Sequence, residues 1–252
     1  MNNDYRILKE DLVSMGLTSG DSVLLHSSFK SLGNVEGGIS TLVDALLSVL
    51  GDKGTLVAPT LTFSSVTEQN PVFDYVNSPS CVGAVSEYIR LMDSSLRSIH
   101  PTHSCSVIGA RAEDFVRDHD KDRTPVGEHS PFRRLREFGG KILMLGCPYG
   151  RNTSMHGVEE LFGVSYLLKP VASVYTVILP ERTYTIDYRR HNIVGNGYAQ
   201  RYERVLPLLS DKHLKYGSIH GAQSCLIDAD GMWETALNKL KEDETYFVEK
   251  TV

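Results

Sequence analysis

Residues 21–60 read DSVLLHSSFKSLGNVEGGISTLVDALLSVLGDKGTLVAPT, and this stretch decides the fold. Its first apolar run, VLL, predicts a buried strand that ends in a polar turn, and its last, TLVA, predicts a second strand. Between them, Leu42, Leu46 and Val49 are spaced for one buried helical stripe, and Gly51 gives the stop signal. A succession of strand, helix and strand favours a layered α/β fold over a helical bundle or a β-sandwich.

The same alternation continues beyond this stretch. Residues 5–16 predict an amphipathic helix, and the apolar run KILMLG at 141–146 predicts a third strand covered on both faces. The stretch 61–140 mixes loops with two predicted helices, near 81–92 and 110–118. Long irregular stretches in a compact domain are usually functional, so we expect this one to contribute to a site.

The last third of the chain predicts strands first and helices after them. SVYTVILP at 173–180 and RTYTIDYR at 182–189 predict two strands. A basic, helix-like segment follows at 197–209, and a closing helix is predicted after DADGMW at 228–233. No internal repeat, low-complexity tract or proline-rich linker marks a boundary, so we predict one domain spanning 1–252.

Composition excludes several classes of partner. The 252 residues are 41% hydrophobic, which is enough for a large core. A net charge of −5 gives no general attraction to nucleic acid or anionic lipid, so neither is expected as a partner. The segment MNNDYRILKEDLVSMG lacks the apolar core of a signal peptide, and no run approaches the roughly 20 apolar residues of a membrane helix. We therefore expect a cytoplasmic globular protein.

The cysteines indicate neither a zinc knuckle nor a disulfide framework. Cys81, Cys105, Cys147 and Cys225 lie far apart, and no C-x-x-C spacing occurs. We expect most of them to be buried thiols.

The turn LLHSSFKSLGNVEGG, residues 24–38, places hydroxyls and glycines between a strand and a helix. Backbone N–H groups point outward there and favour anions, which suits a phosphate or a pantetheine-bearing ligand. The turn matches neither the Walker pattern nor G-x-G-x-x-G, so no motif in it supports the binding of ATP or NAD. An ordinary strand-to-helix turn with a helix cap is the alternative at this point.

The loop RSIHPTHSCSVIG, residues 97–109, contains a potential metal trio. Zinc sites use histidine and cysteine, and His100, His103 and Cys105 are of these types. Pro101 forces an extended segment in which positions three apart need not converge. We therefore favour a polar loop that shapes a pocket over a metal site.

The segment TSMHGVEE, residues 153–160, carries the sharpest chemical signal. On a helix, His156 and Glu159 lie on the same face, so the carboxylate can fix the imidazole tautomer and raise its basicity. Such a pair on its own is more often solvated. Its place just beyond the carboxyl end of a buried strand, where open α/β sheets bind ligands, favours a general base.

Five blocks of the sequence are matched in order and at similar spacing by one family: residues 26–60, 97–109, 127–146, 153–160 and 221–237. They resemble the aminoglycoside 3-N-acetyltransferase family over nearly the whole chain. The resemblance implies a single layered α/β domain with a central mixed sheet flanked by helices, distinct from the common acetyltransferase superfamily. It also implies acetyl-CoA as donor and a sugar amine as acceptor. No metal is expected, because no third ligand is indicated beside His156 and Glu159.

The resemblance assigns roles to individual residues. The catalytic histidine of the family falls on His156 and its partner acid on Glu159. A neutral imidazole would then remove the proton of the attacking amine, and backbone N–H groups of the strand-end turns could hold the oxyanion. The expected CoA contacts are His26, Ser27, Ser28, Lys30, Ser31 and Gly33, with Ser104 and Ser106 near the pantetheine.

The segment after the catalytic block, residues 180–205, departs from the acid-rich pattern expected of enzymes that bind polycations. Its five arginines outnumber its three acids, and His191 adds to the excess. A basic rim suits an anionic acceptor, because arginine pairs with phosphate. A solvated face or local ion pairs are the alternative. We expect the acceptor to meet Arg189 and Arg190, with Asp74 and Tyr75 from a family-like stretch nearby.

The primary hypothesis is therefore N-acetylation of a nucleotide-linked, dTDP-type 3-amino sugar for surface polysaccharide. Aminoglycoside 3-N-acetylation, which confers antibiotic resistance, is the alternative. Cys147 could also take the acetyl group first, because it stands nine residues before His156. Two hypotheses from other functional classes are a non-catalytic CoA-binding protein and a metal hydrolase. As a partner, a second copy of the chain in a homo-oligomer is possible.

Overall fold

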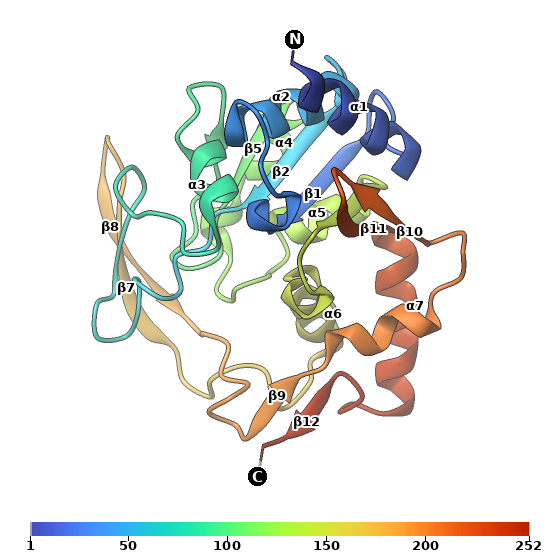
Figure 1. Cartoon of the computed structure of the whole chain (residues 1–252). Helices are drawn as coiled ribbons and strands as arrows, with labels where there is room; N and C mark the ends of the chain where they lie inside the picture. Colours follow the sequence, from blue (N-terminus) through green and yellow to red (C-terminus); the bar gives the residue numbers. More distant parts are fainter. Residues whose placement is uncertain (1, 252) are drawn as a thin grey trace.

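A seven-stranded mixed sheet forms the centre of the computed structural model, which describes residues 2–251 (Figure 1). Across the sheet the order is β10 (Leu214–Ile219), β11 (Ala222–Asp228), β6 (Lys141–Leu145), β1 (Ser22–Ser27), β2 (Thr55–Pro59), β5 (Cys105–Gly109) and β4 (Leu96–Arg97). β1 runs parallel to both β2 and β6, whereas every other pairing in this sheet is antiparallel. The predicted central mixed sheet is confirmed.

The three strands predicted from apolar runs are the central ones, β6, β1 and β2. Nearly all their residues are buried, because helices cover both faces of the sheet. Side chains alternate between the two faces, so Val23 and Leu25 enter one core and Leu24 enters the other. His26 follows the same alternation and lies on the face of Leu24.

Helices α1 (Asn3–Met15), α2 (Gly38–Leu50) and α3 (Ala84–Arg90) cover the first face. The predicted helix over 5–16 is confirmed as α1. It starts at Asn3 because the side chain of Asn2 accepts the backbone N–H of Tyr5 at 2.8 Å. It ends at Gly16, whose φ of 105° is a left-handed conformation that glycine adopts without strain.

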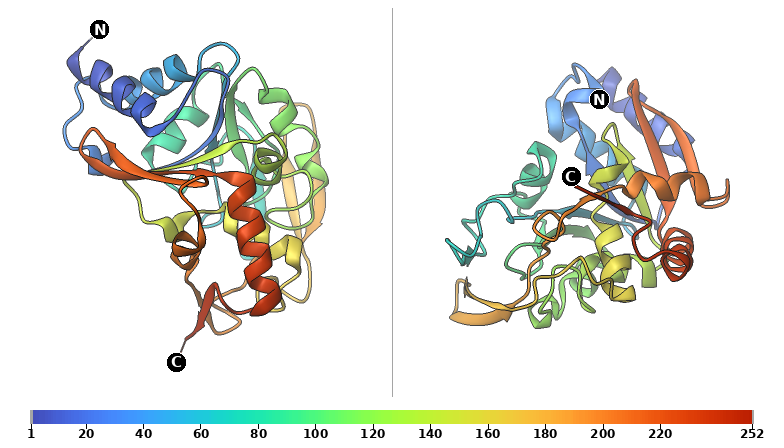
Figure 2. Two further views of the ribbon diagram at one scale, coloured as in Figure 1. Left: turned by 90° about the vertical axis from the view of Figure 1, so that its right-hand side faces the viewer. Right: turned by 90° about the horizontal axis from the view of Figure 1, so that it is seen from below.

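The second face carries α4 (Ala112–Val116), α5 (Pro131–Glu137), α6 (Ser154–Phe162) and α7 (Ala229–Glu242). Figure 2 shows α1 and α2 on one side of the sheet and α7 on the other. The largest buried side chain of this half, Trp233 on α7, packs in the same core as Val158 on α6. Helix α6, which carries the predicted pair His156 and Glu159, therefore lies on this second face of the sheet.

The long stretch 61–140 contains more structure than its sequence indicates. The two helices predicted near 81–92 and 110–118 exist as the shorter α3 and α4. The strand β5 was not predicted. Its five residues follow a loop rich in histidine and serine, and only pairing with β2 completes the pattern. The elements β3 (Val72–Asp74), β4 and α5 were not predicted either, and the two strands among them have only two or three residues.

The two strands predicted after residue 170 are β7 (Ser173–Ile178) and β8 (Thr183–Tyr188), which form a three-stranded sheet with β3. The predicted helix-like segment over 197–209 is wrong in its first part, and in its second part the helix is of the 3-10 type. Its first part is β9 (Tyr198–Gln200), paired with β12 (Val248–Lys250), and its second is the 3-10 helix η4 (Tyr202–Leu208), where Pro207 lacks a backbone N–H.

The closing helix starts within DADGMW instead of after it. Asp228 caps α7 by accepting the backbone N–H of Gly231 at 2.7 Å, which fixes the first turn at Ala229. Across residues 2–251, none of the helices combines the length and the apolar character that crossing a bilayer requires.

Candidate active site

Helix α6 carries the predicted catalytic pair, and its packing explains the glycine between the two residues. The helix follows β6 after the short 3-10 helix η3 (Tyr149–Arg151). A Cβ atom at Gly157 would collide with the ring of Trp233 and with Val126. The missing side chain thus lets α6 lie close to α7, while His156 and Glu159 face away from that contact toward η4.

His156 and Glu159 are linked through a tyrosine. Nδ1 of His156 lies 3.5 Å from Oε2 of Glu159 and 2.7 Å from the hydroxyl of Tyr202. The same hydroxyl donates to Oε2 of Glu159 at 2.5 Å. Tyr202 gives its only hydrogen to the carboxylate. Its contact with His156 is therefore a hydrogen bond only if Nδ1 of His156 carries a hydrogen and donates it to the tyrosine oxygen. This arrangement leaves Nε2 of His156 with the lone pair that a general base needs.

Glu159 has no exposed surface and is held by two tyrosines. Tyr166 donates to Oε1 at 2.7 Å, and Tyr202 donates to Oε2. Burial and the charge of Glu159 raise the pKa of Tyr166 and of Tyr202 above the ordinary range for tyrosine. Both tyrosines therefore stay protonated and act as hydrogen-bond donors to the carboxylate.

A cavity of about 830 Å³ opens beside His156. It lies between the carboxyl ends of β1 and β2, the start of α6 and the segment that follows β8. Nε2 of His156 lies 3.1 Å from the side-chain amide nitrogen of Gln200. Polar residues in the cavity wall include His26, Ser27, Ser28, Thr102, His103, Asn152, Thr153, His156, Arg190, His191, Gln200 and Tyr202.

The predicted CoA-binding turn lies only partly in the cavity wall. His26, Ser27 and Ser28 line the cavity at the end of β1. Nε2 of His26 is buried without a hydrogen-bond partner among residues 2–251, and burial lowers the pKa of this histidine to about 4. An unpaired polar atom beside a cavity fits a ligand that supplies the partner. The other predicted residues of the turn, Lys30, Ser31 and Gly33, are exposed and lie outside the wall.

Ser104 and Ser106 do not reach the cavity. Both are fully buried, and their hydroxyls bond to Thr60. Ser104 also accepts from Nε of Arg97 at 3.1 Å. These contacts hold the strand ends together, so the two serines are placed as supports of the sheet and not as contacts for pantetheine.

The four predicted acceptor contacts are separated in the fold. Asp74 accepts the backbone N–H groups of Val76 and Asn77, and the hydroxyl of Tyr75 donates to the carbonyl of Arg97, so neither lines the cavity. Arg189 also lies outside it. Arg190 lines it, and its guanidinium donates to the carbonyls of Val66 and Phe63, both at 2.8 Å.

The predicted basic rim is smaller than the sequence suggests. Three of the five arginines have acidic partners outside the cavity: Arg182 with Asp120, and Arg201 and Arg204 with Glu249. Arg190, from the predicted segment, and Arg151, after β6, are the arginines in the wall, which contains no aspartate or glutamate among the described residues.

Sequence reasoning missed a second histidine–glutamate pair in the wall. Nε2 of His191 lies 2.7 Å from Oε1 of Glu160, and the ring of His191 stands 4.3 Å from the ring of His156. The segment HGVEE, residues 156–160, did contain a signal, because it has two consecutive acids and only one histidine to pair with them. A pattern on one helix cannot show that a residue 31 positions later completes the second pair.

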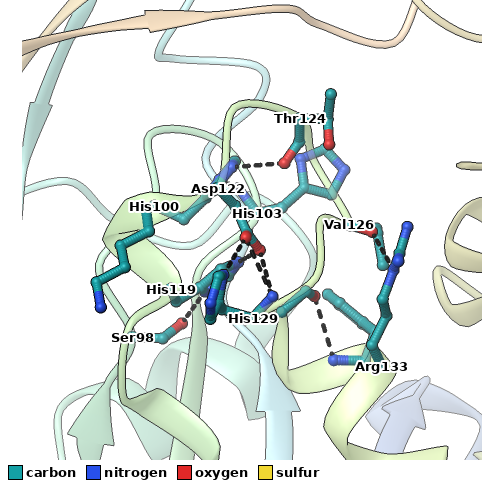
Figure 3. A network of polar contacts seen from close by, with 12 residues as sticks. Ser98, His100, His103, His119, Asp122, Thr124, Val126, His129 and Arg133 are labelled. Carbon is teal, nitrogen blue, oxygen red and sulfur yellow. Dashed lines mark hydrogen bonds and ion pairs between the residues drawn. The ribbon is translucent and has the colours of Figure 1, made fainter.

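The three residues considered as a metal trio have different surroundings, and His100 lies in a network of polar contacts with His119 close by (Figure 3). Nδ1 of His100 accepts the backbone N–H groups of Thr102 and His103, and its ring stacks on His119 at 4.7 Å. His103 turns toward the cavity wall instead. Cys105 lies inside β5, and burial raises the pKa of its thiol. This geometry fits the predicted pocket-shaping loop.

Cys147 lies in the cavity wall, but its environment disfavours the thiolate. Burial raises the pKa of its thiol to about 12. A thiol in this state is a poor nucleophile.

Comparison with known proteins gives consistent matches over most of the chain. The family model for aminoglycoside 3-N-acetyltransferase matches residues 24–241. An aminoglycoside N(3)-acetyltransferase IV of Salmonella sp is 30% identical over 94% of this chain and 87% of its own length. An aminoglycoside N(3)-acetyltransferase VII of Streptomyces paromomycinus is 34% identical over 61% of this chain, and the match spans 59% of that relative's length.

Solved structures are similar across nearly the whole chain. AAC(3)-IVa, as a histidine-to-alanine mutant in complex with a gentamicin, superposes with a TM-score of 0.82 at 29% identity, covering 96% of this chain and 90% of that chain. AAC-IIIb, as a binary complex with CoASH, superposes with a TM-score of 0.79 at 26% identity, covering 94% of this chain and 96% of that chain. The predicted fold class is confirmed.

Proposed function

Because this chain belongs to the aminoglycoside 3-N-acetyltransferase family, we propose that it transfers the acetyl group of acetyl-CoA to the amine of an amino sugar, with His156 as general base. The observation that carries the proposal is the buried link from His156 through Tyr202 to Glu159 at the wall of a large cavity. A solvated helix face, the alternative reading of the sequence, would not bury Glu159 completely.

The proposed chemistry uses the two nitrogens of His156 differently. Nδ1–H is fixed by Tyr202, so Nε2 faces the amine as an acceptor. Nε2 takes the proton of the amine while the nitrogen attacks the thioester carbonyl, and the imidazolium that forms lies 3.5 Å from Glu159. Glu159 stabilises this positive charge, as the acid of a catalytic triad does.

Acetyl-CoA fits the strand-end wall of the cavity. The hydroxyls of Ser27 and Ser28 and the unpaired Nε2 of His26 are polar groups that a pantetheine amide could satisfy. One related structure, AAC-IIIb, holds CoASH. No step in this proposal requires a metal.

For the acceptor, the relatives favour an aminoglycoside over the nucleotide-linked amino sugar that the arginine count suggested. The two curated relatives described above are named aminoglycoside N(3)-acetyltransferases, and the solved structure of the AAC(3)-IVa mutant holds a gentamicin. One observation keeps the nucleotide-linked sugar as a second candidate. Arg151 and Arg190 line the cavity, and no carboxylate among the described residues does. A polycation would find no counter-charge in that wall, whereas a phosphate would find two partners.

The experiment is a direct comparison of acceptors. Purified protein is given acetyl-CoA with gentamicin, with sisomicin or with a dTDP-linked 3-amino sugar, and the release of CoA thiol is measured. Turnover of the aminoglycosides with 3-N-acetylated product supports the main proposal. Turnover of the nucleotide sugar alone would select the second candidate, and failure of all amino sugars would reject both.

A further inference from the structure

Two histidines meet in the cavity wall, and each has its own buried carboxylate. The rings of His156 and His191 are 4.3 Å apart and tilted by 38°. His156 is tied to Glu159 and His191 to Glu160. Consecutive residues of a helix point about 100° apart, so the two acids leave α6 in different directions and serve different imidazoles. One base requires only one of these pairs.

The segment of His191 is held firmly against the region after α6. The backbone N–H of Asn192 donates to Leu167 at 2.7 Å, and that of Lys169 donates to Arg190 at 2.8 Å. The side chain of Glu160 is only 3% exposed, and its Oε1 accepts the backbone N–H of Val126 at 2.7 Å. The pair is therefore preorganised and is not a surface contact.

Burial determines how this pair holds its protons. Burial raises the pKa of Glu160, whereas burial and the neighbouring His156 lower the pKa of His191. Both effects disfavour an isolated charge, and this favours a pair without net charge that shares one proton between Oε1 of Glu160 and Nε2 of His191. If the shared proton is on Nε2, His191 is an imidazolium with a hydrogen on each nitrogen. If it is on Oε1 of Glu160, the neutral imidazole accepts at Nε2 and has its hydrogen on Nδ1. In both cases Nδ1 of His191 carries a hydrogen. No atom among residues 2–251 forms a hydrogen bond with this Nδ1.

We propose that His191, backed by Glu160, is the general acid of the reaction and donates its Nδ1 proton to the sulfur of the departing CoA. This inference rests on the proposed acetyl transfer. In the step, the N–C bond forms, the C–S bond breaks, and the amine proton passes to Nε2 of His156. The sulfur takes the proton from Nδ1 of His191, and the shared proton moves fully onto Nε2, leaving the Glu160 carboxylate.

Because the rings of His156 and His191 are close together, the proton transfer at each histidine favours the transfer at the other. When His156 becomes an imidazolium, its charge stands next to the His191–Glu160 pair and makes that pair a better acid. When the pair has given up its proton, its negative charge stabilises the imidazolium. Passage of one proton from His156 back to His191, directly or through water, then resets the site.

The test compares two acetyl donors in the full chain. His191→Asn removes the acid, and acetyl-CoA is compared with Se-acetyl seleno-CoA, whose selenolate leaves without needing a proton. With acetyl-CoA, kcat should fall about a hundredfold or more in the variant. With the selenoester, it should fall by no more than about threefold, because the missing acid no longer limits the reaction.

A matched control is His213→Asn. His213 also pairs with a carboxylate, Asp228 at 3.2 Å, but it lies outside the cavity wall. This variant should keep wild-type kcat with both donors. The Kd for CoA should be the same in His191→Asn and in the wild type, which separates a lost acid from a lost binding site.

The outcomes separate this inference from the proposed function. Equal losses with the two donors in His191→Asn, in a protein whose wild type is active, would overturn only the role of His191. A wild type that acetylates no amine with either donor would reject the proposed function and this role with it. Independently of turnover, ¹⁵N NMR of the His191 ring should show a protonated Nδ1 at neutral pH, and an unprotonated Nδ1 would contradict the proposal.

Discussion

The hydroxyl of Tyr202 lies 2.7 Å from Nδ1 of His156, although the two residues are 46 positions apart in the chain. The same hydroxyl donates to Glu159, so the tyrosine joins the imidazole to its carboxylate. Nδ1 of His156 and Oε2 of Glu159 are 3.5 Å apart, which is too long for a strong direct hydrogen bond. The orientation of His156 therefore depends on Tyr202 as much as on Glu159.

Tyr202→Phe should lower kcat about 10- to 100-fold and leave the KM for acetyl-CoA nearly unchanged, because it frees the imidazole to rotate and to change tautomer. Steady-state kinetics at saturating acceptor would measure both constants. Tyr198→Phe is the control, because the hydroxyl of Tyr198 makes no hydrogen bond to residues 2–251 and its ring packs on Tyr166. Equal kcat in the two variants would contradict the linking role of Tyr202.

Glu159→Gln should lower kcat by about a hundredfold or more, because the amide cannot stabilise the imidazolium. It should also cost about 1–3 kcal/mol of folding stability, because two buried tyrosine hydroxyls lose a charged acceptor. Activity and urea unfolding would measure the two effects. Glu242→Gln, at the exposed end of α7, should change neither. Full activity with reduced stability in Glu159→Gln would mean that the carboxylate is only structural.

Acid should destabilise the protein from about pH 6.5 downward. Burial lowers the pKa of His26 and of His100 to about 4, whereas the unfolded chain titrates near 6.5. Between these values the unfolded state binds more protons, so stability is complete above the unfolded pKa and falls as the pH falls. Each such histidine contributes a slope of about 1.4 kcal/mol per pH unit.

Urea unfolding at several pH values would measure this slope. His119 is also fully buried, its Nε2 has no hydrogen-bond partner among the described residues and lies 3.9 Å from Oδ2 of Asp122, and burial holds its pKa well below the ordinary value. His119→Gln should therefore make the slope shallower, whereas replacing the exposed acid Glu242 by glutamine should not. A stability that does not change between pH 7 and 5 would contradict the neutral burial of these histidines.

Cys147→Ser should keep near-normal kcat, because a thiol whose pKa is about 12 offers almost no thiolate at neutral pH to carry an acetyl group. The exposed Cys81 provides an internal control, since it should react with iodoacetamide well before Cys147 does. Loss of all transfer in Cys147→Ser, with the fold retained, would instead indicate an acetyl-cysteine intermediate.

The sequence predicts the centre of the fold well because the central strands are continuous apolar runs. β1, β2 and β6 are buried on both faces, so their pattern does not depend on their partners. β5 and β9 have no such pattern, and their pairing with β2 and β12 decides their conformation. The error over 197–209 has this cause, since tertiary pairing outweighs a local helical spacing.

The candidate site was predictable where its residues share one helix. His156 and Glu159 are three positions apart, so their meeting follows from helical geometry alone. Tyr202, Gln200 and His191 come from segments far along the chain, and only the fold brings them to the same cavity. The arginine excess misled for the same reason, since a linear count cannot show that Glu249 pairs with two of those side chains.

The most direct test of the central claim is His156→Ala, measured for acetyl transfer to an amino sugar and for CoA binding by calorimetry. With His156 as general base, kcat/KM should fall about 10²- to 10⁴-fold while the Kd for CoA stays within about twofold of the wild type. Unchanged turnover in His156→Ala, with CoA bound equally well, would contradict the assignment.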